Sequence, residues 1–225
     1  MIRLSCAASG SSGNCYSLTD ESGNILLLDA GILLPEIKKL VNWKTSSIIG
    51  AFISHEHNDH SKSADKLRKM GIPVFEPYKG GKQSFMSGGW KMASFDLPHD
   101  GVDNRGCFIV SPDGHKMVYL TDFEYCPYIF HKQKLNTFLI ECNHLDDIDK
   151  DDNEGKFAHV LRGHSSLGTV LEFLRINKTD ALKTVVLCHL STDNADPDEM
   201  VRRVQEVVGT SVRVFVARKG VTLDL

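Results

Sequence analysis

Short apolar runs alternate with turn signals along the whole chain, and this pattern predicts a protein rich in strands. Several runs are almost continuously apolar, which is typical of strands that are covered on both faces of their sheet. The predicted strands cover residues 3–7, 25–28, 48–53, 74–75, 106–110, 116–120, 137–140, 184–187 and 212–216.

Helical patterns lie between these apolar runs. Residues 63–70 precede a glycine that can end a helix, and residues 166–176 carry apolar side chains at helical spacing. Asp196 followed by Pro197 has the form of an N-cap and a first-turn proline, which predicts a third helix. Many strands with interspersed helices indicate a layered α/β or α+β domain. No internal repeat and no linker divides the chain, so we expect one domain over residues 1–225.

Five of the apolar runs lead into residues that can bind a metal ion or orient a ligand. These residues follow their runs at once or after one intervening position, and they are Asp29, His55, Asp122, Glu141 and His189. Side chains at strand ends can converge on one rim of a sheet, where loops hold functional groups on a rigid scaffold. Polar residues also end strands because loops are exposed to water, and this explains any single case. It explains the repeated choice of His and Asp poorly, so we expect a functional site at this rim.

A dense group of metal-binding side chains follows the apolar run 48–53. His55 and His57 are two residues apart in an extended segment, so they can share one metal ion. Asp59 and His60 come after the turn and can face a second ion. Imidazole and carboxylate ligands suit Zn²⁺, Mn²⁺ or Fe ions, and the lack of thiolates argues against a closed structural zinc site. The alternative is a histidine-rich exposed loop, which this spacing disfavours.

Composition narrows the class of protein without giving its function. No apolar run approaches the roughly 20 residues that a membrane helix needs, and the N-terminus lacks the apolar segment of a secretory signal. The absence of such a run predicts no membrane contact. The six cysteines are scattered with no C-x-x-C pair, so we expect the protein to lie in the reducing cytoplasm. The formal net charge of −3 argues against a broad basic surface for duplex DNA. Bound divalent metals would add local positive charge that this count omits.

The pattern His55-x-His57-x-Asp59-His60 resembles the H-x-H-x-D-H signature of metallo-β-lactamase-fold hydrolases. Further positions are similar to the family's other metal-site motifs, and in chain order they are Asp29, His99, Asp122 and His189. The resemblance covers nearly the whole chain. It is closest to the YycJ/WalJ-like subgroup, and PhnP-like phosphodiesterases are more distant. Four segments carry this subgroup resemblance, namely residues 8–14, 141–144, 163–166 and 189–191. The chain departs from the subgroup where Leu145 precedes Asp146 and where residues 146–155 are acidic.

The resemblance implies an α+β fold, the four-layer αββα sandwich, with two divalent metal ions (Zn or Mn, with Fe possible) at one edge. One ion would be held by His55, His57 and His99, and the other by Asp59, His60 and His189. Asp122 would bridge the two ions, and Asp29 would orient the histidines. A hydroxide held between the metals would attack phosphorus in a phosphodiester substrate. That substrate would be a nucleic acid or a small cyclic or nucleotide ester.

The remaining candidates surround this centre. His164 and Asp59 are the expected catalytic residues, His164 as the acid that protonates the departing oxygen or as a phosphate contact. Ser12, Asn14 and His144 are the expected substrate-binding residues. For residues 9–14 the alternative is a tight turn that joins two strands. For His144 it is a hydrogen bond that supports other site residues.

Three rival functions fit parts of the same pattern. A thioester or lactam hydrolase would use the same metal motif, although Asp122 stands where many lactam-hydrolysing relatives have Cys. A redox di-iron centre is disfavoured by His57, where such relatives have Glu. A non-catalytic metal-bound interaction module is disfavoured because all seven candidate ligands are present.

Overall fold

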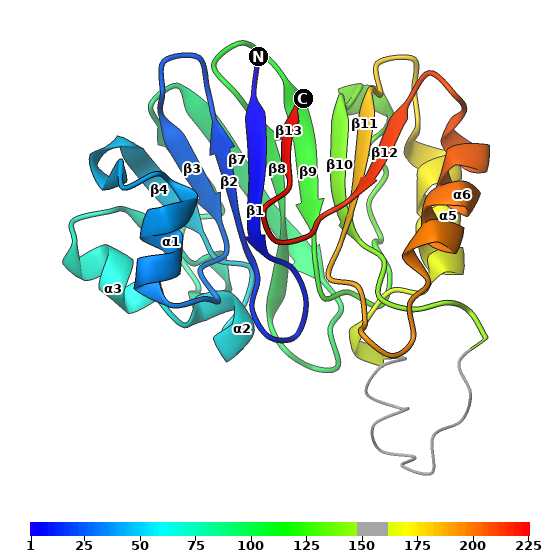
Figure 1. Ribbon diagram of the computed structural model, residues 1–225, viewed down its shortest axis with the longest axis horizontal. Helices are drawn as coiled ribbons and strands as arrows, with labels where there is room; N and C mark the ends of the chain where they lie inside the picture. The colour runs from blue at the N-terminus through cyan, green and yellow to red at the C-terminus, as the bar shows by residue number, and fades with distance from the viewer. Residues whose placement is uncertain (148–161) are drawn as a thin grey trace.

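Two β-sheets face each other in this computed structural model and carry the longer helices on their outer surfaces (Figure 1). The structure describes residues 1–147 and 162–225. Of the acidic segment 146–155, the part from residue 148 onward lies outside the described residues. In the described part of the chain, no helix is both long enough and apolar enough to cross a bilayer.

The first sheet has six strands in the order β13-β1-β2-β3-β4-β5. They are β1 (Arg3–Ala8), β2 (Cys15–Thr19), β3 (Ile25–Leu28), β4 (Ile48–Phe52), β5 (Val74–Phe75) and β13 (Thr222–Asp224). The helices α1 (Leu34–Leu40) and α3 (Ala64–Lys69) lie on its outer side, and α2 (Asn58–Ser61) is a single turn (Figure 1).

The second sheet has seven strands in the order β12-β11-β10-β9-β8-β7-β6. They are β6 (Ser84–Ser87), β7 (Trp90–Leu97), β8 (Asn104–Val110), β9 (Lys116–Leu120), β10 (Thr137–Glu141), β11 (Thr184–Cys188) and β12 (Arg213–Val216). The helices α5 (Leu167–Asn177) and α6 (Pro197–Val208) cover its outer side (Figure 1). Short 3-10 helices occupy Thr45–Ser47, Pro77–Lys79 and His131–Gln133.

Alternation along the strands explains why their sequences are apolar throughout. In β3, Leu26 and Leu28 pack between the two sheets, whereas Ile25 and Leu27 pack with residues of α1 and α3. The strand β9 alternates in the same way between the inter-sheet core and the core beneath α5 and α6. Successive side chains of a strand point to opposite faces, so a strand covered on both sides has no polar positions. The three apolar layers confirm the predicted αββα sandwich.

The sequence pattern missed the strands β2, β6, β7 and β13 and the helix α1. The strand β2 reads C-Y-S-L-T, and it forms because its backbone pairs with β1 on one side and β3 on the other. The strand β13 has three residues and forms because it pairs with β1. Tertiary pairing, and not local apolarity, decides these elements. The helix predicted after Asp196 is confirmed, because the Asp196 carboxylate accepts hydrogen bonds from the N–H groups of Asp198 and Glu199.

Candidate metal centre

The carboxyl ends of five strands meet at one edge of the two sheets. β3 and β4 run parallel in the first sheet, and β9, β10 and β11 run parallel in the second. Parallel strands end at the same edge, so the loops that follow them start close together. The residues marked by the sequence pattern lie at these strand ends: Glu141 is the last residue of β10, and Asp29, His55, Asp122 and His189 follow β3, β4, β9 and β11.

Three residues at this edge have a left-handed backbone conformation. The φ angles are 56° at Asp29, 50° at Asp122 and 50° at His189. Such a conformation costs roughly 1–3 kcal/mol for a residue other than glycine, although Asp and His tolerate it better than most. Each of these turns comes just after its strand, and the three side chains contact one another or His60 within the cluster.

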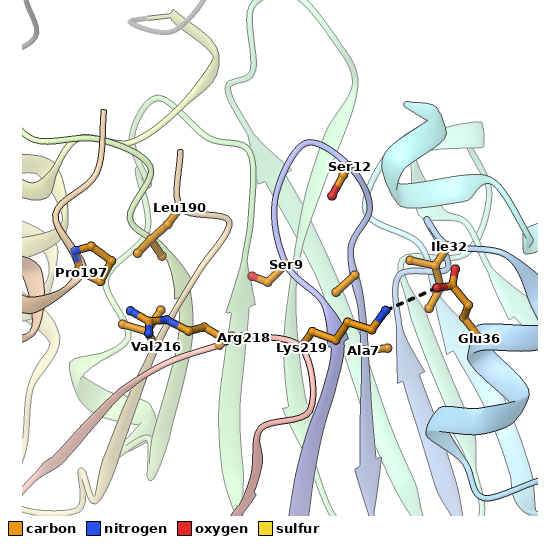
Figure 2. Close-up of a pocket in the computed structure, with 12 residues that line it drawn as sticks. Ala7, Ser9, Ser12, Ile32, Glu36, Leu190, Pro197, Val216, Arg218 and Lys219 are labelled. Atoms are coloured by element: carbon orange, nitrogen blue, oxygen red, sulfur yellow. Dashed lines mark ion pairs between the residues drawn. The ribbon is translucent and has the colours of Figure 1, made fainter. Parts of the chain in front are cut away.

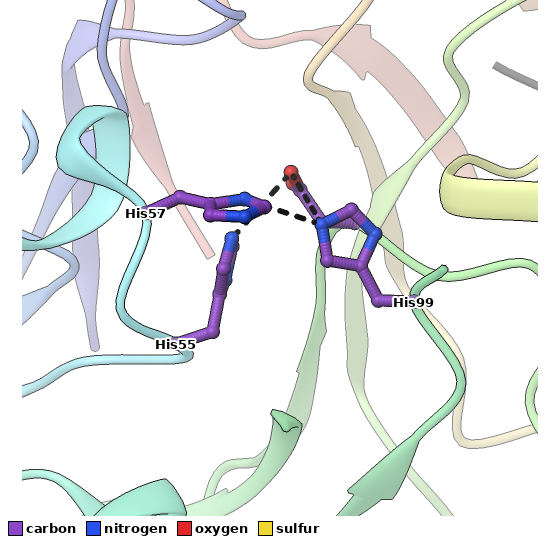
Figure 3. A group of neighbouring side chains, drawn as sticks. His55, His57 and His99 are labelled. Atoms are coloured by element: carbon purple, nitrogen blue, oxygen red, sulfur yellow. Dashed lines mark hydrogen bonds and ion pairs between the residues drawn. The ribbon is translucent and has the colours of Figure 1, made fainter. Parts of the chain in front are cut away.

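Three histidines and Asp122 form the first group of potential ligands (Figure 3). The ligand atoms of His55, His57, His99 and Asp122 all lie within 4.8 Å of one another. His99 Nε2 lies 3.4 Å from His57 Nδ1 and 3.9 Å from Asp122 Oδ2, and His55 Nε2 is also 3.9 Å from that oxygen. His55 Nε2 is buried and has no hydrogen-bond partner. An orphaned ring nitrogen that faces two imidazoles and a carboxylate fits a divalent cation.

The second group lies on the other side of the Asp122 carboxylate. It consists of Asp59, His60, Asp122 and His189, again with ligand atoms within 4.8 Å. His60 Nε2 is 3.3 Å from both Asp59 Oδ2 and Asp122 Oδ1, and His189 Nδ1 contacts the same Asp122 oxygen. Asp122 thus presents Oδ2 to the first group and Oδ1 to the second. The cluster can bind metal ions, and its two halves share one carboxylate.

Electrostatics keeps this carboxylate charged despite its burial. Burial alone would raise the pKa of Asp122, but the imidazoles of His189 and His60 together outweigh burial and hold this pKa well below its usual range. Burial lowers the pKa of His55 well below its usual value, and His60 adds to this effect, so His55 is neutral. Burial also lowers the pKa of His189, yet Asp122 and Glu141 together raise it to about 10. A cation entering the cluster would displace such a proton, as metal binding to imidazole generally does.

The backbone around α2 fixes Asp59 and His60 against the neighbouring loops. Asn14 N–H donates to the Asp59 carbonyl at 2.7 Å, and Ala30 N–H donates to the His60 carbonyl at 2.8 Å. Gly31 packs directly on this turn, since a Cβ atom there would lie 1.5 Å from the Asp59 carbonyl oxygen. Glycine is therefore required at position 31 for α2 to approach the first sheet.

Asp29 holds His60 in one orientation. Asp29 Oδ2 accepts hydrogen bonds from His60 Nδ1 at 2.6 Å and from the Tyr119 hydroxyl at 2.6 Å, and Oδ1 accepts from Ser54 N–H at 2.8 Å. The residue is completely buried. Because Nδ1 is engaged, His60 presents Nε2 to the second group. This contact is the orienting role that the resemblance implies for Asp29.

Asp29→Asn should weaken metal binding without removing a ligand. The amide cannot accept hydrogen bonds from His60, Tyr119 and Ser54 as the carboxylate does. We therefore expect the affinity for metal to fall about 10- to 100-fold, the usual loss when the hydrogen-bond partner of a ligand is removed. Competition with a chromophoric chelator measures this loss. Asp20→Asn is the matched control, because Asp20 also bonds a buried side chain, Trp90 Nε1, away from the cluster. Equal affinities in the two variants would contradict the assignment.

Glu141 joins His164 to the cluster, and the sequence pattern marked its strand end without giving it a role. Glu141 Oε1 accepts a hydrogen bond from His164 Nδ1 at 2.7 Å and lies 3.3 Å from His189 Nδ1. Glu141 Oε2 accepts from Phe123 N–H at 3.0 Å. Burial raises the pKa of Glu141, but His164 lowers it to about 2. Burial lowers the pKa of His164, but Glu141 raises it above its usual value, so a proton on His164 is stabilised.

The three expected substrate-binding residues differ in their burial and in their contacts. The tight-turn alternative for residues 9–14 is observed, because this loop joins β1 and β2 and Gly13 N–H donates to the Gly10 carbonyl. Asn14 is buried, with its amide nitrogen 2.9 Å from His60 Nε2. Ser12 is exposed on the same loop. His144 is buried outside the potential ligand groups, with Nδ1 donating to the Leu145 carbonyl. Their contact with substrate stays a prediction.

Comparison with known proteins agrees with this geometry. No family model matches the chain. The chain is 25% identical to exodeoxyribonuclease YycJ of Bacillus anthracis over an aligned length of 258 residues. The alignment covers 97% of this chain and 90% of that protein. Its structure is similar to the metallo-β-lactamase fold protein YhfI from Bacillus subtilis, with a TM-score of 0.74 and 17% identity over 99% of this chain and 98% of that one. It is also similar to a diphosphatase of the PhnP family, with a TM-score of 0.69 and 14% identity over 100% and 98% of the two chains.

Proposed function

This chain has the metallo-β-lactamase fold, and from that premise we propose that it is a metal-dependent phosphodiesterase that cleaves nucleic acid. The observation that carries the proposal is the position of Asp122, whose two carboxylate oxygens face two separate groups of imidazoles. A carboxylate shared in this way suits a pair of divalent ions, the arrangement used by many phosphatases and nucleases. The likeness to an exodeoxyribonuclease supports DNA as the substrate.

Each ion has its own ligands in this proposal. His55, His57 and His99 would hold one ion, Asp59, His60 and His189 would hold the other, and Asp122 would serve as a ligand in both groups. The ligand set of imidazoles and carboxylates suits Zn²⁺ or Mn²⁺, and Fe ions also use it. When bound, such a pair supplies Lewis acidity that activates a water molecule and neutralises charge on the phosphoryl oxygens. The protein's contribution is to hold these ligands on rigid strand ends.

His164 supplies the proton for the departing oxygen. Glu141 accepts a hydrogen bond from Nδ1 of His164 and raises the pKa of His164 above its usual value, so the ring is held in one orientation and its protonated form is stabilised. The ring lies close to the ligand shell, with its centroid 5.5 Å from that of His99 and 5.2 Å from that of His189. A group so placed can act as a general acid on a substrate bound at the cluster.

Hydrolysis of bis(p-nitrophenyl) phosphate tests the proposal. The purified protein should release nitrophenol with Mn²⁺ or Zn²⁺, and excess chelator should stop the reaction. His57→Ala should abolish turnover because it removes a ligand from the first group. His131→Ala is the control, since His131 is exposed in a 3-10 helix and lies outside the cluster. Turnover that survives both the chelator and His57→Ala would overturn the proposal.

A further inference from the structure

Two adjoining pockets form one basic groove, the first between the first sheet and the loops at the end of the second sheet, and the second on the outer side of the first sheet. The first pocket, about 400 Å³, is bordered by Ser9, Ser12, Arg218 and Lys219 among others (Figure 2). The second, about 500 Å³, is bordered by residues that include Arg3 and Lys39. Ala7, Glu36 and Lys219 line both pockets, so the two spaces adjoin each other. Each has the volume of a small-ligand site, roughly 300–1,000 Å³, so together they can hold more than one nucleotide unit.

The groove starts at the wall of the metal centre. The loop 9–14 separates the two, with Asn14 turned toward His60 and with Ser9 and Ser12 lining the first pocket. Ser9 Oγ accepts a hydrogen bond from His189 N–H at 2.9 Å, so a residue that lines the groove directly contacts a residue of the second ligand group. A chain molecule bound at the cluster can therefore continue past this loop into the groove.

The charges of the groove differ from those of the whole protein. The chain carries a formal net charge of −3. The lining of the two pockets holds four cations and one carboxylate, which are Arg3, Lys39, Arg218, Lys219 and Glu36. Lys219 is 3.7 Å from Glu36, and Arg3 is 3.0 Å from Asp224. Arg218 and Lys39 have no ion pair with any residue in the described ranges 1–147 and 162–225, so their charge is available to an anion.

The fold fixes the backbone from which these cations project. Arg218 and Lys219 stand in the turn between β12 and β13, where Val221 N–H donates to the Arg218 carbonyl and Gly220 N–H donates to the Cys6 carbonyl. Figure 2 shows the Arg218 and Lys219 side chains on opposite sides of Ser9, with Lys219 reaching toward Glu36. Lys39 and Glu36 are three residues apart on α1, so they lie on the same face of that helix.

We infer that this groove binds the phosphate backbone of a single-stranded polynucleotide whose scissile bond lies at the metal centre. The inference rests on the proposed phosphodiesterase function and extends it, because it makes a strand and not a small ester the substrate. A narrow path of exposed cations suits a flexible single strand, whereas the acidic remainder of the surface does not suit a duplex. Arg218 would contact the phosphate near the cluster, and Lys39 a phosphate farther along the strand.

Strand binding tests the groove separately from catalysis. Fluorescence anisotropy with a labelled single strand in excess EDTA reports binding without cleavage. Arg218→Gln and Lys39→Gln should each weaken binding about fivefold, as expected for an exposed charge contact. Each should also reduce the slope of log Kd against log salt concentration by about 0.7, the value for one phosphate contact on a single strand. Arg175→Gln and Lys183→Gln, at the far end of α5 and before β11, are the matched controls.

Glu36→Gln should have the opposite effect. It removes the one carboxylate that lines the groove and releases Lys219, while glutamine can still accept the Leu33 N–H bond that caps α1. We expect the strand to bind more tightly, by about threefold, because one repulsive charge is lost and one cation is gained. Weaker binding in this variant would contradict an anionic occupant, and a variant that gains affinity has evidently folded.

Cleavage kinetics and a lipid arm complete the test. For the Arg218→Gln/Lys39→Gln double variant, kcat/KM on a strand relative to kcat/KM on bis(p-nitrophenyl) phosphate should fall about 25-fold, because distant contacts add. If the groove variants bind the strand more weakly but the protein hydrolyses no ester, the groove inference stands and the phosphodiesterase proposal is overturned. Hydrolysis with equal strand binding in variants and controls would overturn the groove alone. Binding to phosphatidylserine vesicles that depends on the groove, without binding of the strand, would also overturn the inference that the groove binds a polynucleotide.

Discussion

Asp122→Asn is expected to reduce hydrolysis of bis(p-nitrophenyl) phosphate by about a thousandfold or more, since groups that act as one unit fail together. The side chain is buried, and its two oxygens face the two halves of the cluster. Asparagine has nearly the same shape but offers one oxygen and no charge, so the two ions can no longer share it. Metal analysis of the purified variant should find a loss of one ion or both from each chain.

Asp180→Asn is the control for this experiment, because Asp180 is exposed in the loop before β11, at the other end of the strand from His189. Thermal unfolding with and without metal separates a damaged site from a damaged fold. Full metal content with normal turnover in Asp122→Asn would refute the shared carboxylate, because the metal sites would then not depend on it.

Much of the cluster could be predicted because its residues carry local signals. His55 and His57 lie two positions apart after an apolar strand, and Asp122 and His189 each follow another one. The αββα layers could be predicted from the family resemblance, and the strands that cross the core could be found because both of their faces are apolar. In these cases, the sequence itself contains the spacing that the structure uses.

Other features depend on contacts between distant segments. Glu141 acts on His164, 23 residues later, and this contact exists because the end of β10 lies beside the start of α5. Arg218 and Lys39 line adjoining pockets because β13 pairs with β1, which in turn lies next to α1. No local pattern marks either pair. The overall charge of −3 argued against a broad basic surface for duplex DNA but could not reveal a local groove, because a net count averages over its four cations.

His164→Ala is expected to slow cleavage of an ordinary nucleotide phosphodiester by about 100- to 10,000-fold, the range of general acid catalysis. The departing sugar oxygen is a poor leaving group and needs the proton that Glu141 stabilises on His164. Nitrophenolate departs readily as an anion, so turnover of bis(p-nitrophenyl) phosphate should fall far less. Rates for a series of aryl and alkyl phosphodiesters measure this difference as a steeper dependence on the leaving group's pKa in the variant.

Glu141→Gln should show the same selectivity in a weaker form. The amide no longer raises the pKa of His164, so a smaller fraction of the molecules carries a protonated His164 at a given pH, but the ring itself is still present. The expected order of loss on the nucleotide ester is therefore His164→Ala, then Glu141→Gln, then His131→Ala with no loss. If His164→Ala slowed good and poor leaving groups equally, the ring would be acting on the metal ligands or on substrate position. A proton transferred to the leaving oxygen predicts unequal losses, because only the poor leaving groups require it.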